Sequence, residues 1–214
     1  MRISLEGVLT VIKSIVLAVA MVMAAAPATT TLTQEERDKG IAELEGSKKM
    51  FLDATKGLSP AQWNFKSAPD RWSIAECADH IALSESFIFG RITDGVMKAP
   101  LTPEKRDLTK GKDEKLLVMV QDRSFKAKAP EPIDPTKTPM TPEESVKKFL
   151  EARAKTEEFI KTTQEDLRDH MYDHPVPVFG TMDAYQWTLF LSGHTRRHTL
   201  QILEVKADPN FPKM

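Results

Sequence analysis

Two histidines spaced one helical turn apart are the first residues in this sequence that could do chemistry. The segment His194-Thr-Arg-Arg-His198 places its imidazoles four residues apart, and on a helix this spacing separates them by only about 40° around the axis. Such a pair can hold one divalent metal ion. Trp187, Leu191 and Ile202 share the same helical stripe, so we expect both imidazoles to point into a core. The spacing alone leaves an ordinary pair of core or surface histidines as an equal alternative.

A third candidate ligand is His80, which follows Glu76-Cys-Ala-Asp. Three histidines from two facing helices would leave coordination positions open for water or substrate, as in catalytic rather than closed structural sites. The motif is not that of a zincin protease, because Thr195 stands where the general-base glutamate would be. Cys77 is an alternative fourth ligand, but a small buried hydrophobic residue is the better interpretation.

The remaining histidines and the nearby carboxylates give weaker signals. His170 and His174 are also four residues apart, but the proline after His174 disfavours helix there. We therefore expect a surface turn, with His174 at the mouth of a pocket as the alternative. Asp79 and Glu85 are candidate general bases, although solvated charges on a helix face explain both. Core packing accounts for Trp63 and Trp72.

The elements that position these residues begin with a recurring helix-start signal. In each case a capping oxygen precedes a glutamate or glutamine by three residues, so that the two side chains satisfy free backbone N–H groups reciprocally. The pairs are Thr33/Glu36, Ser73/Glu76, Thr141/Glu144 and, less strongly, Asp183/Gln186. Together with apolar residues at helical intervals, they predict helices over 33–56, 73–98, 141–163 and 183–206. The last helix is apolar on two sides, which is typical of a central position.

A long connection, residues 99–140, separates the second and third predicted helices. It contains six prolines and should be mostly extended or irregular, with a short helix over 112–123. The sequence has no internal repeat and no strand-like alternation of useful length. These features predict an all-α fold, a four-helix bundle with a long crossover between helices 2 and 3, rather than an α/β domain.

The N-terminus has the layout of a secretory signal peptide. An apolar run over 15–26 follows a segment with Arg2 and Lys13 and ends in Ala26-Pro-Ala28, which predicts cleavage after Ala28. An uncleaved N-terminal anchor is the alternative. We therefore expect residues 1–28 to be a signal peptide and 29–214 to form one helical-bundle domain. The expected location is the periplasm or the outside of the cell, with no membrane contact after cleavage.

Composition excludes several function classes. The 30 basic and 31 acidic residues give a net charge of −1, and without a basic block this balance argues against a nucleic-acid partner. The single cysteine excludes an internal disulfide framework. The expected partners are an unidentified small-molecule substrate or ligand and, from a weak hint only, a second copy of the chain in a homodimer.

The combined pattern resembles the DinB-like superfamily of metal-dependent enzymes. The resemblance runs in order through residues 58–63, 69–80, 174–180 and 187–202, and so covers essentially the whole chain after the signal peptide. It implies a four-helix bundle with a three-histidine metal site, and His80, His194 and His198 fall on the ligand positions. Characterised members include thiol-dependent transferases and a mycothiol-dependent isomerase, in which the metal activates a low-molecular-weight thiol.

Two classes of function follow as hypotheses. The first is an exported metal-dependent enzyme, either a hydrolase or a thiol-dependent transferase, with a divalent ion at His80, His194 and His198. The second is a non-catalytic bundle that binds a small ligand or is only stapled by its metal. Imidazole ligands suit zinc, nickel and iron alike, so the sequence leaves the metal open.

Overall fold

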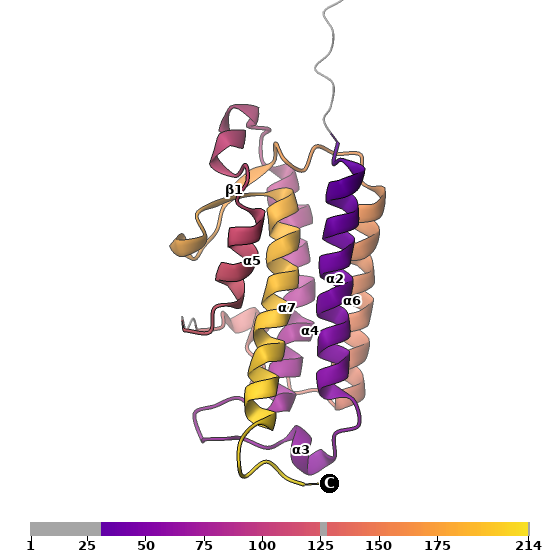
Figure 1. The fold of residues 1–214 in the computed structure, drawn as a ribbon, viewed down its shortest axis with the longest axis vertical. Helices are drawn as coiled ribbons and strands as arrows, with labels where there is room; N and C mark the ends of the chain where they lie inside the picture. Colours follow the sequence, from indigo (N-terminus) through magenta and orange to yellow (C-terminus); the bar gives the residue numbers. More distant parts are fainter. Residues whose placement is uncertain (1–30, 125–127, 214) are drawn as a thin grey trace, which may run out of the picture. The chain divides into compact units, whose positions relative to one another are not determined.

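The structure is a computed structural model that describes residues 31–124 and 128–213, so the predicted signal peptide, residues 1–28, lies outside the described residues. Four long helices form a bundle (Figure 1): α2 (Gln34–Thr55), α4 (Ile74–Asp94), α6 (Pro142–Thr162) and α7 (Ala184–Lys206). The predicted all-α four-helix bundle is therefore confirmed. Among the described residues, none of the helices has the length and apolar character needed to cross a bilayer.

Each long helix starts at its predicted capping pair. Thr33, Ser73, Thr141 and Asp183 all accept a hydrogen bond from the backbone N–H three residues on, and the glutamate or glutamine there accepts one in return. The predicted boundaries hold closely except that α4 ends at Asp94, and a short 3-10 turn, η1 (Val96–Lys98), follows it. A fifth pair of the same kind, Ser59 and Gln62, starts the unpredicted one-turn helix α3 (Pro60–Trp63).

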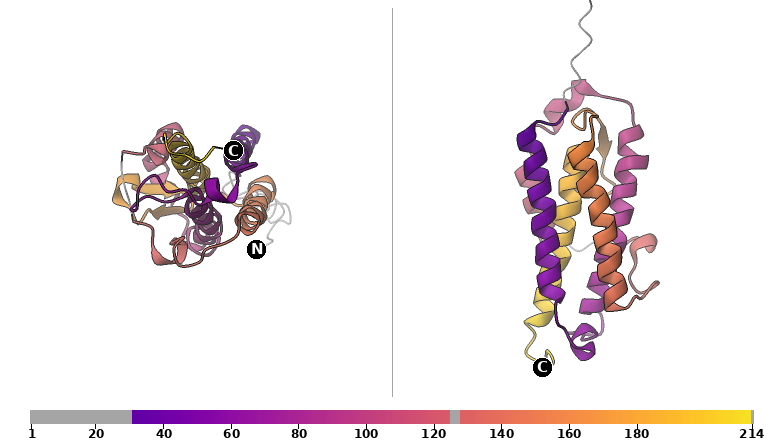
Figure 2. Two further views of the ribbon diagram at one scale, coloured as in Figure 1. Left: turned by 90° about the horizontal axis from the view of Figure 1, so that it is seen from below. Right: turned by 90° about the vertical axis from the view of Figure 1, so that its right-hand side faces the viewer.

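Helices α2 and α7 run in one direction, and α4 and α6 run in the other (Figures 1 and 2). The starts of α2 and α7 meet where the Tyr185 hydroxyl donates to the carbonyl of Glu36, at 2.8 Å. Their ends meet where Lys206 Nζ donates to the carbonyl of Ala54, also at 2.8 Å. The long crossover is what allows α4 and α6 to be parallel, because a short loop joins only antiparallel neighbours.

The crossover holds the predicted short helix, α5 (Asp113–Gln121), between the 3-10 turns η2 (Pro103–Leu108) and η3 (Glu131–Ile133). Helix α5 packs against α7 on the side away from α2 (Figure 1). Gly193 permits this close approach, since a Cβ atom there would lie only 3.0 Å from Cγ1 of Val120. Helix α7 thus contacts α2, α4 and α5, and its predicted central position is confirmed.

A small hairpin precedes α7, although the sequence showed no strand signal. Strands β1 (Met171–Asp173) and β2 (Thr181–Asp183) pair antiparallel, with Tyr172 opposite Met182. The loop between them contains the 3-10 turn η4 (Pro177–Phe179) and returns at Gly180, whose φ of +62° favours glycine. Three residues per strand are too few for a periodic pattern to be recognised. Asp183 ends β2 and also caps α7.

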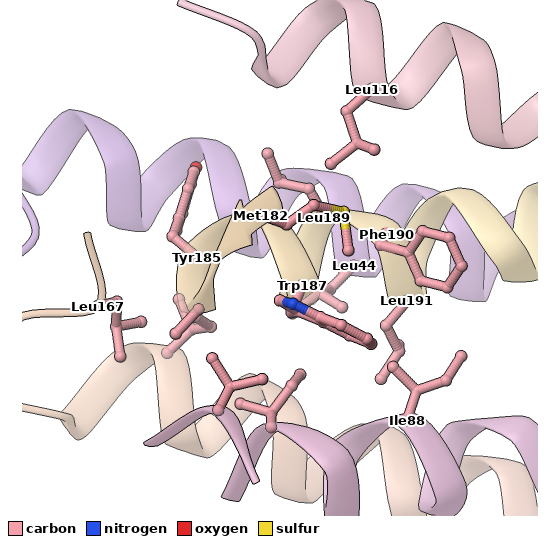
Figure 3. Close-up of a cluster of buried hydrophobic side chains, with 14 of the residues drawn as sticks. Leu44, Ile88, Leu116, Leu167, Met182, Tyr185, Trp187, Leu189, Phe190 and Leu191 are labelled. Carbon is pink, nitrogen blue, oxygen red and sulfur yellow. The ribbon is translucent and has the colours of Figure 1, made fainter. Parts of the chain in front are cut away.

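The core consists of two apolar clusters at different heights in the bundle. The upper apolar cluster gathers around Leu44, Tyr185 and Leu191 (Figure 3), and the lower apolar cluster gathers around Phe51, Ile81 and Ile202. On each of the four helices, the residues between the two clusters include buried polar side chains, namely Ser47, Glu85, Arg153 and Thr195. A polar layer therefore crosses the bundle between the clusters.

An ion pair forms the centre of this polar layer. Arg153 is fully buried and donates to both carboxylate oxygens of Glu85, at 2.9 and 2.5 Å. It also donates to Ser47 Oγ at 2.7 Å and to the carbonyl of Leu44, while the Thr195 hydroxyl donates to Glu85 at 2.6 Å. The pair thereby joins all four helices, and the interpretation of Glu85 as a solvated charge was wrong.

The interpretation of Asp79 as a solvated charge was wrong as well. Asp79 is buried, and its carboxylate accepts hydrogen bonds from the hydroxyl of Ser145 and, at 3.1 Å, from the backbone N–H of Met140. Burial raises the pKa of Asp79, and the Ser145 hydrogen bond opposes that rise. Asp79 therefore ties the start of α4 to the start of α6.

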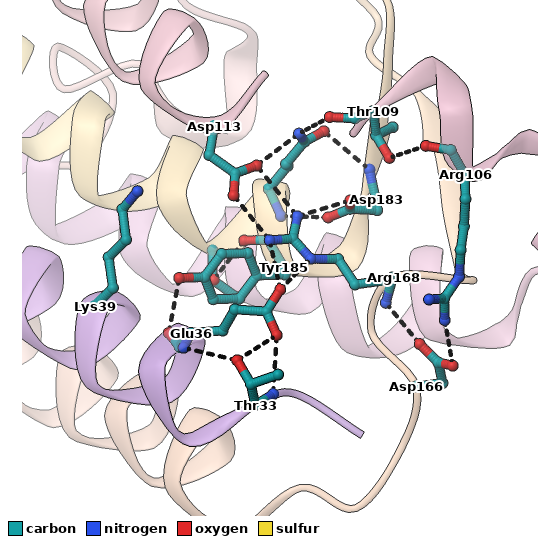
Figure 4. A network of polar contacts seen from close by, with 12 residues as sticks. Thr33, Glu36, Lys39, Arg106, Thr109, Asp113, Asp166, Arg168, Asp183 and Tyr185 are labelled. Carbon is teal, nitrogen blue, oxygen red and sulfur yellow. Dashed lines mark hydrogen bonds and ion pairs between the residues drawn. The ribbon is translucent and has the colours of Figure 1, made fainter. Parts of the chain in front are cut away.

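A second polar network closes the opposite end of the bundle, around Arg168 (Figure 4). Its guanidinium pairs with Glu36 at 2.9 Å, with Asp113 at 2.8 Å and with the buried Asp183 at 3.0 Å, and it stacks over the Tyr185 ring. The network joins the starts of α2, α5 and α7. It anchors the start of α7, the helix that carries His194 and His198.

Candidate metal centre

The structure brings together the three histidines that the sequence singled out. His80 lies on α4, and His194 and His198 lie one turn apart on α7. The ring centroids are 5.1 Å apart for His80 and His194, 4.4 Å for His80 and His198, and 4.5 Å for His194 and His198. One ring nitrogen from each lies within 4.8 Å of the others, so a single ion could contact all three.

Hydrogen bonds orient two of the three rings. His80 Nδ1 lies 2.7 Å from the carbonyl oxygen of Ile133 in η3, an acceptor that places the proton on Nδ1 and leaves Nε2 as the free lone pair. His198 Nδ1 lies 3.1 Å from Gln201 Oε1, an acceptor with the same effect. Partners of this kind, behind the ligand, set the tautomer and aim the ring in metal sites. Gln201 was missed from the sequence, although its position three residues after His198 places it on the same helix face.

The surroundings keep all three imidazoles neutral. Burial lowers the pKa of His80 from 6.5 to about 4. Burial also holds the pKa values of His194 and His198 well below their ordinary range, and the neighbouring histidines add to the effect. A neutral imidazole is the form that donates a lone pair to a metal.

The three histidines line a cavity of about 480 Å³, a volume typical of small-molecule sites. Aromatic side chains form much of the rest of its wall: Trp72, Phe87, Phe179, Trp187 and Phe190. Trp187 and Phe190 also belong to the upper apolar cluster (Figure 3). One side of the cavity is therefore rigid core, and the other side consists of loops.

Two of these loops bring Trp72 and His174 to the cavity wall. Trp72 packs against the lower apolar cluster, as core packing predicts, and it also lines the cavity, with its ring 4.8 Å from that of His80 and 5.9 Å from that of His198. His174 was assigned to a surface turn, but it too lines the cavity, packed against Trp187 and Phe190 with centroids 5.0 and 4.7 Å apart. The weaker alternative for His174, the mouth of a pocket, describes its position better.

The other candidate ligands lie apart from the three histidines. Cys77 is a free thiol buried in the lower apolar cluster, where burial strongly raises its pKa, and it does not line the cavity. His170 is buried beside the carbonyl of Ala99, and its backbone bridges to Leu101. Among the described residues, neither is grouped with the three histidines as a ligand. Thr195 belongs to the polar layer, where its hydroxyl donates to Glu85.

Comparison with known proteins identifies the family. The sequence pattern of the DinB superfamily matches residues 43–202, which include all three histidines. The chain belongs to the DinB superfamily. The chain is also similar to the uncharacterized protein YuaE of Bacillus subtilis (strain 168), at 28% identity over 151 residues, which cover 71% of this chain and 87% of YuaE.

A solved structure gives a more distant likeness. YfiT from Bacillus subtilis, described as a probable metal-dependent hydrolase with an unusual four-helix bundle topology, aligns with a TM-score of 0.49 and 14% identity. The alignment covers 83% of this DinB-superfamily chain and 89% of YfiT. The predicted resemblance to DinB-like proteins is thus confirmed for the helical domain by the superfamily match.

Proposed function

We propose that this DinB-superfamily protein is a metal-dependent enzyme whose single divalent ion is held by His80, His194 and His198. The observation that carries the proposal is the convergence of three neutral imidazoles from two facing helices on the wall of a small-molecule cavity. The donor set fits zinc, nickel or iron. A metal ion held by these three residues would supply Lewis-acid chemistry at the cavity wall: it would polarise a substrate oxygen or lower the pKa of a water or thiol into the neutral range.

The chain's own residues supply position and protons. Trp72 covers His80 and His198, which limits the access of water to the ligands. The backbone N–H of Val176 lies 3.0 Å from His174 Nδ1 and donates to it. The Val176 carbonyl also lies 3.3 Å from Nδ1; in the tautomer that accepts from the Val176 N–H, the ring carries its proton on Nε2 and can donate a hydrogen bond to a substrate oxygen. Burial lowers the pKa of His174 and keeps the ring in this neutral form.

Two reactions fit this arrangement, hydrolysis and thiol transfer. The protein's own thiol cannot be the nucleophile, because Cys77 is buried outside the cavity. The nucleophile is therefore water or a small external thiol, and the cavity volume accommodates either together with a small substrate. Export of the protein, proposed from residues 1–28, would favour water, because low-molecular-weight thiols are concentrated in the cytosol.

The test compares metal-free protein with protein reconstituted with zinc, nickel or iron in two assays. One follows hydrolysis of chromogenic esters and amides, and the other follows addition of a small thiol to an electrophilic aromatic chloride. We expect metal-dependent turnover in one assay, loss of that turnover in His194→Ala, and retention in His170→Ala. His170 is the matched control because it is a buried histidine away from the cavity.

The same samples separate an enzyme from a stapled bundle. The two apolar clusters and the Glu85–Arg153 layer pack the bundle without help from the three histidines, so we expect the metal-free protein to stay folded. Unfolding on metal removal, with no turnover in either assay, would overturn the enzyme proposal in favour of a structural metal.

A further inference from the structure

The charge of the cavity lining differs sharply from that of the whole chain. The chain carries 30 basic and 31 acidic residues. Among the described residues, the lining has one acidic side chain, Asp70, and five basic ones, namely Arg71, Arg91, Arg123, Lys128 and Arg197. The near-equal numbers of basic and acidic residues in the chain do not account for this excess of basic residues. Basic side chains are therefore concentrated at the cavity.

Three of the five basic side chains form no ion pair within the part of the chain that the structure describes. Among the described residues, no carboxylate lies within ion-pair distance of Arg71, Arg91 or Lys128, whereas Arg123 pairs with Glu204 at 3.0 Å. The Arg91 guanidinium lies over the ring of Phe87, which also lines the cavity. All three unpaired cations are solvent-exposed at the rim and are therefore available to a ligand.

Two further cations lie close to the histidines. Arg197 is on α7 between His194 and His198, and its guanidinium donates to the backbone carbonyl of Asp122. Arg123 donates to Gln201 Oε1 at 3.1 Å, the same oxygen that His198 Nδ1 faces. Basic side chains therefore extend from the rim of the cavity to the three histidines. A concave site with charges of one sign and apolar walls concentrates ions of the opposite sign.

We propose that this cavity takes a small anionic substrate, in which a carboxylate, phosphate or sulfonate group is joined to an apolar or aromatic part. The proposal deepens the proposed function, because it takes the cavity beside the three histidines to be the substrate site. The basic side chains bind the anionic group, and Trp72, Phe87, Phe179 and Phe190 pack against the apolar part. A nucleic acid does not suit the site, because the basic residues surround a concave cavity of about 480 Å³ rather than forming an extended surface.

The test uses two dyes that differ only in one anionic group, 1-anilinonaphthalene-8-sulfonate and the neutral N-phenyl-1-naphthylamine. Both are titrated into metal-free wild type by fluorescence, so that a metal ion cannot itself attract the sulfonate. We expect the sulfonate dye to bind about fivefold more tightly or better at low salt, and the preference to shrink as salt is added.

Two triple variants with the same change in net charge assign the effect to the cavity. The cavity variant is Arg71→Gln/Arg91→Gln/Lys128→Gln, and the control, on exposed parts of α2 and α6 outside the cavity, is Lys49→Gln/Lys147→Gln/Lys155→Gln. We expect the cavity variant to lose about tenfold in affinity for the sulfonate dye and none for the neutral dye. The control should bind both dyes like wild type.

Equal affinities of wild type for the two dyes, or equal losses in the two triple variants, would overturn the proposal. The metal content of the same preparations keeps the two proposals separate. A protein that prefers the sulfonate dye but binds no metal supports the anionic substrate and refutes the metal centre. A protein that binds metal without preferring the sulfonate dye does the reverse.

Discussion

Replacing Glu85 by leucine should destabilise the bundle more than any surface change, because it leaves the buried Arg153 guanidinium without its ion-pair partner. Arg153 is fully buried, and among the described residues Glu85 is the only carboxylate that pairs with it; its other hydrogen-bond partners are neutral oxygens of Leu44, Ser47 and Thr195. Breaking a buried pair on one side costs about 3–5 kcal/mol. We expect the upper half of this range, because Thr195 also loses its acceptor.

The double variant Glu85→Leu/Arg153→Met gives the decisive comparison. Replacing both charges of a buried pair by apolar groups is often neutral or stabilising relative to the wild type. The double variant should therefore recover at least about 2 kcal/mol of the loss seen in Glu85→Leu. Urea unfolding of the metal-free proteins, followed by far-ultraviolet circular dichroism, measures these free energies.

If the leucine variant does not fold, Glu85→Gln still allows the free energy of unfolding to be measured. It retains an oxygen for Arg153 and Thr195 but removes the negative charge, and it should cost about 2–3 kcal/mol. A loss below about 1 kcal/mol in both single variants would refute the account of the polar layer. The same conclusion would follow from a double variant as unstable as the sum of its single changes.

Three further predictions concern the site and the helix packing. Burial lowers the pKa of His80 from 6.5 to about 4, so acidification through this range favours the unfolded, protonated state by up to about 3 kcal/mol; urea unfolding of metal-free protein should show about 2 kcal/mol of this loss between pH 7 and pH 5. Gln201→Leu removes the acceptor beside His198 and should weaken metal affinity about tenfold or more in a chelator competition. Gly193→Ala forces a Cβ against Val120 and should cost about 1 kcal/mol in thermal unfolding despite a better helix propensity.

Matched variants control these predictions. His80→Gln should reduce the fall in stability between pH 7 and pH 5; an unchanged pH dependence contradicts the role given to this ring. Gly46→Ala introduces a Cβ that meets only the guanidinium end of Arg196, a long side chain that can shift, so it should be neutral or stabilising by up to about 1 kcal/mol. Equal effects of the two glycine variants would contradict the close approach of α5 to α7. Unaltered metal affinity in Gln201→Leu would show that the hydrogen bond to Gln201 is not needed to orient the His198 ring.

The helices were predictable because their start signals are local. A threonine, a serine or an aspartate three residues before a glutamate or glutamine satisfies backbone groups within the same turn, so no distant partner is needed to read it. The pairing of His194 with His198 is local in the same way. That His80 faces them was expected from the family resemblance, since apolar spacing places a residue on a helix face without saying which helix it meets.

The features that the sequence did not predict depend on distant parts of the chain. Glu85 looks like a surface charge until Arg153, 68 residues later, is placed beside it. Trp72 and His174 lie on loops, and only the packed bundle decides that both loops close over the same histidines. The basic residues at the cavity are likewise scattered from Arg71 to Arg197, and no spacing rule connects them.

The most direct test of the central claim is the metal content of the purified protein and of two variants, His80→Ala and His194→Ala, measured by inductively coupled plasma mass spectrometry after reconstitution with zinc, nickel or iron. We predict about one equivalent of metal in the wild type, and in the His170→Ala control, and its loss in both variants. A wild type that stays metal-free with all three salts, or folded variants that keep a full equivalent, would contradict a metal centre at these three histidines.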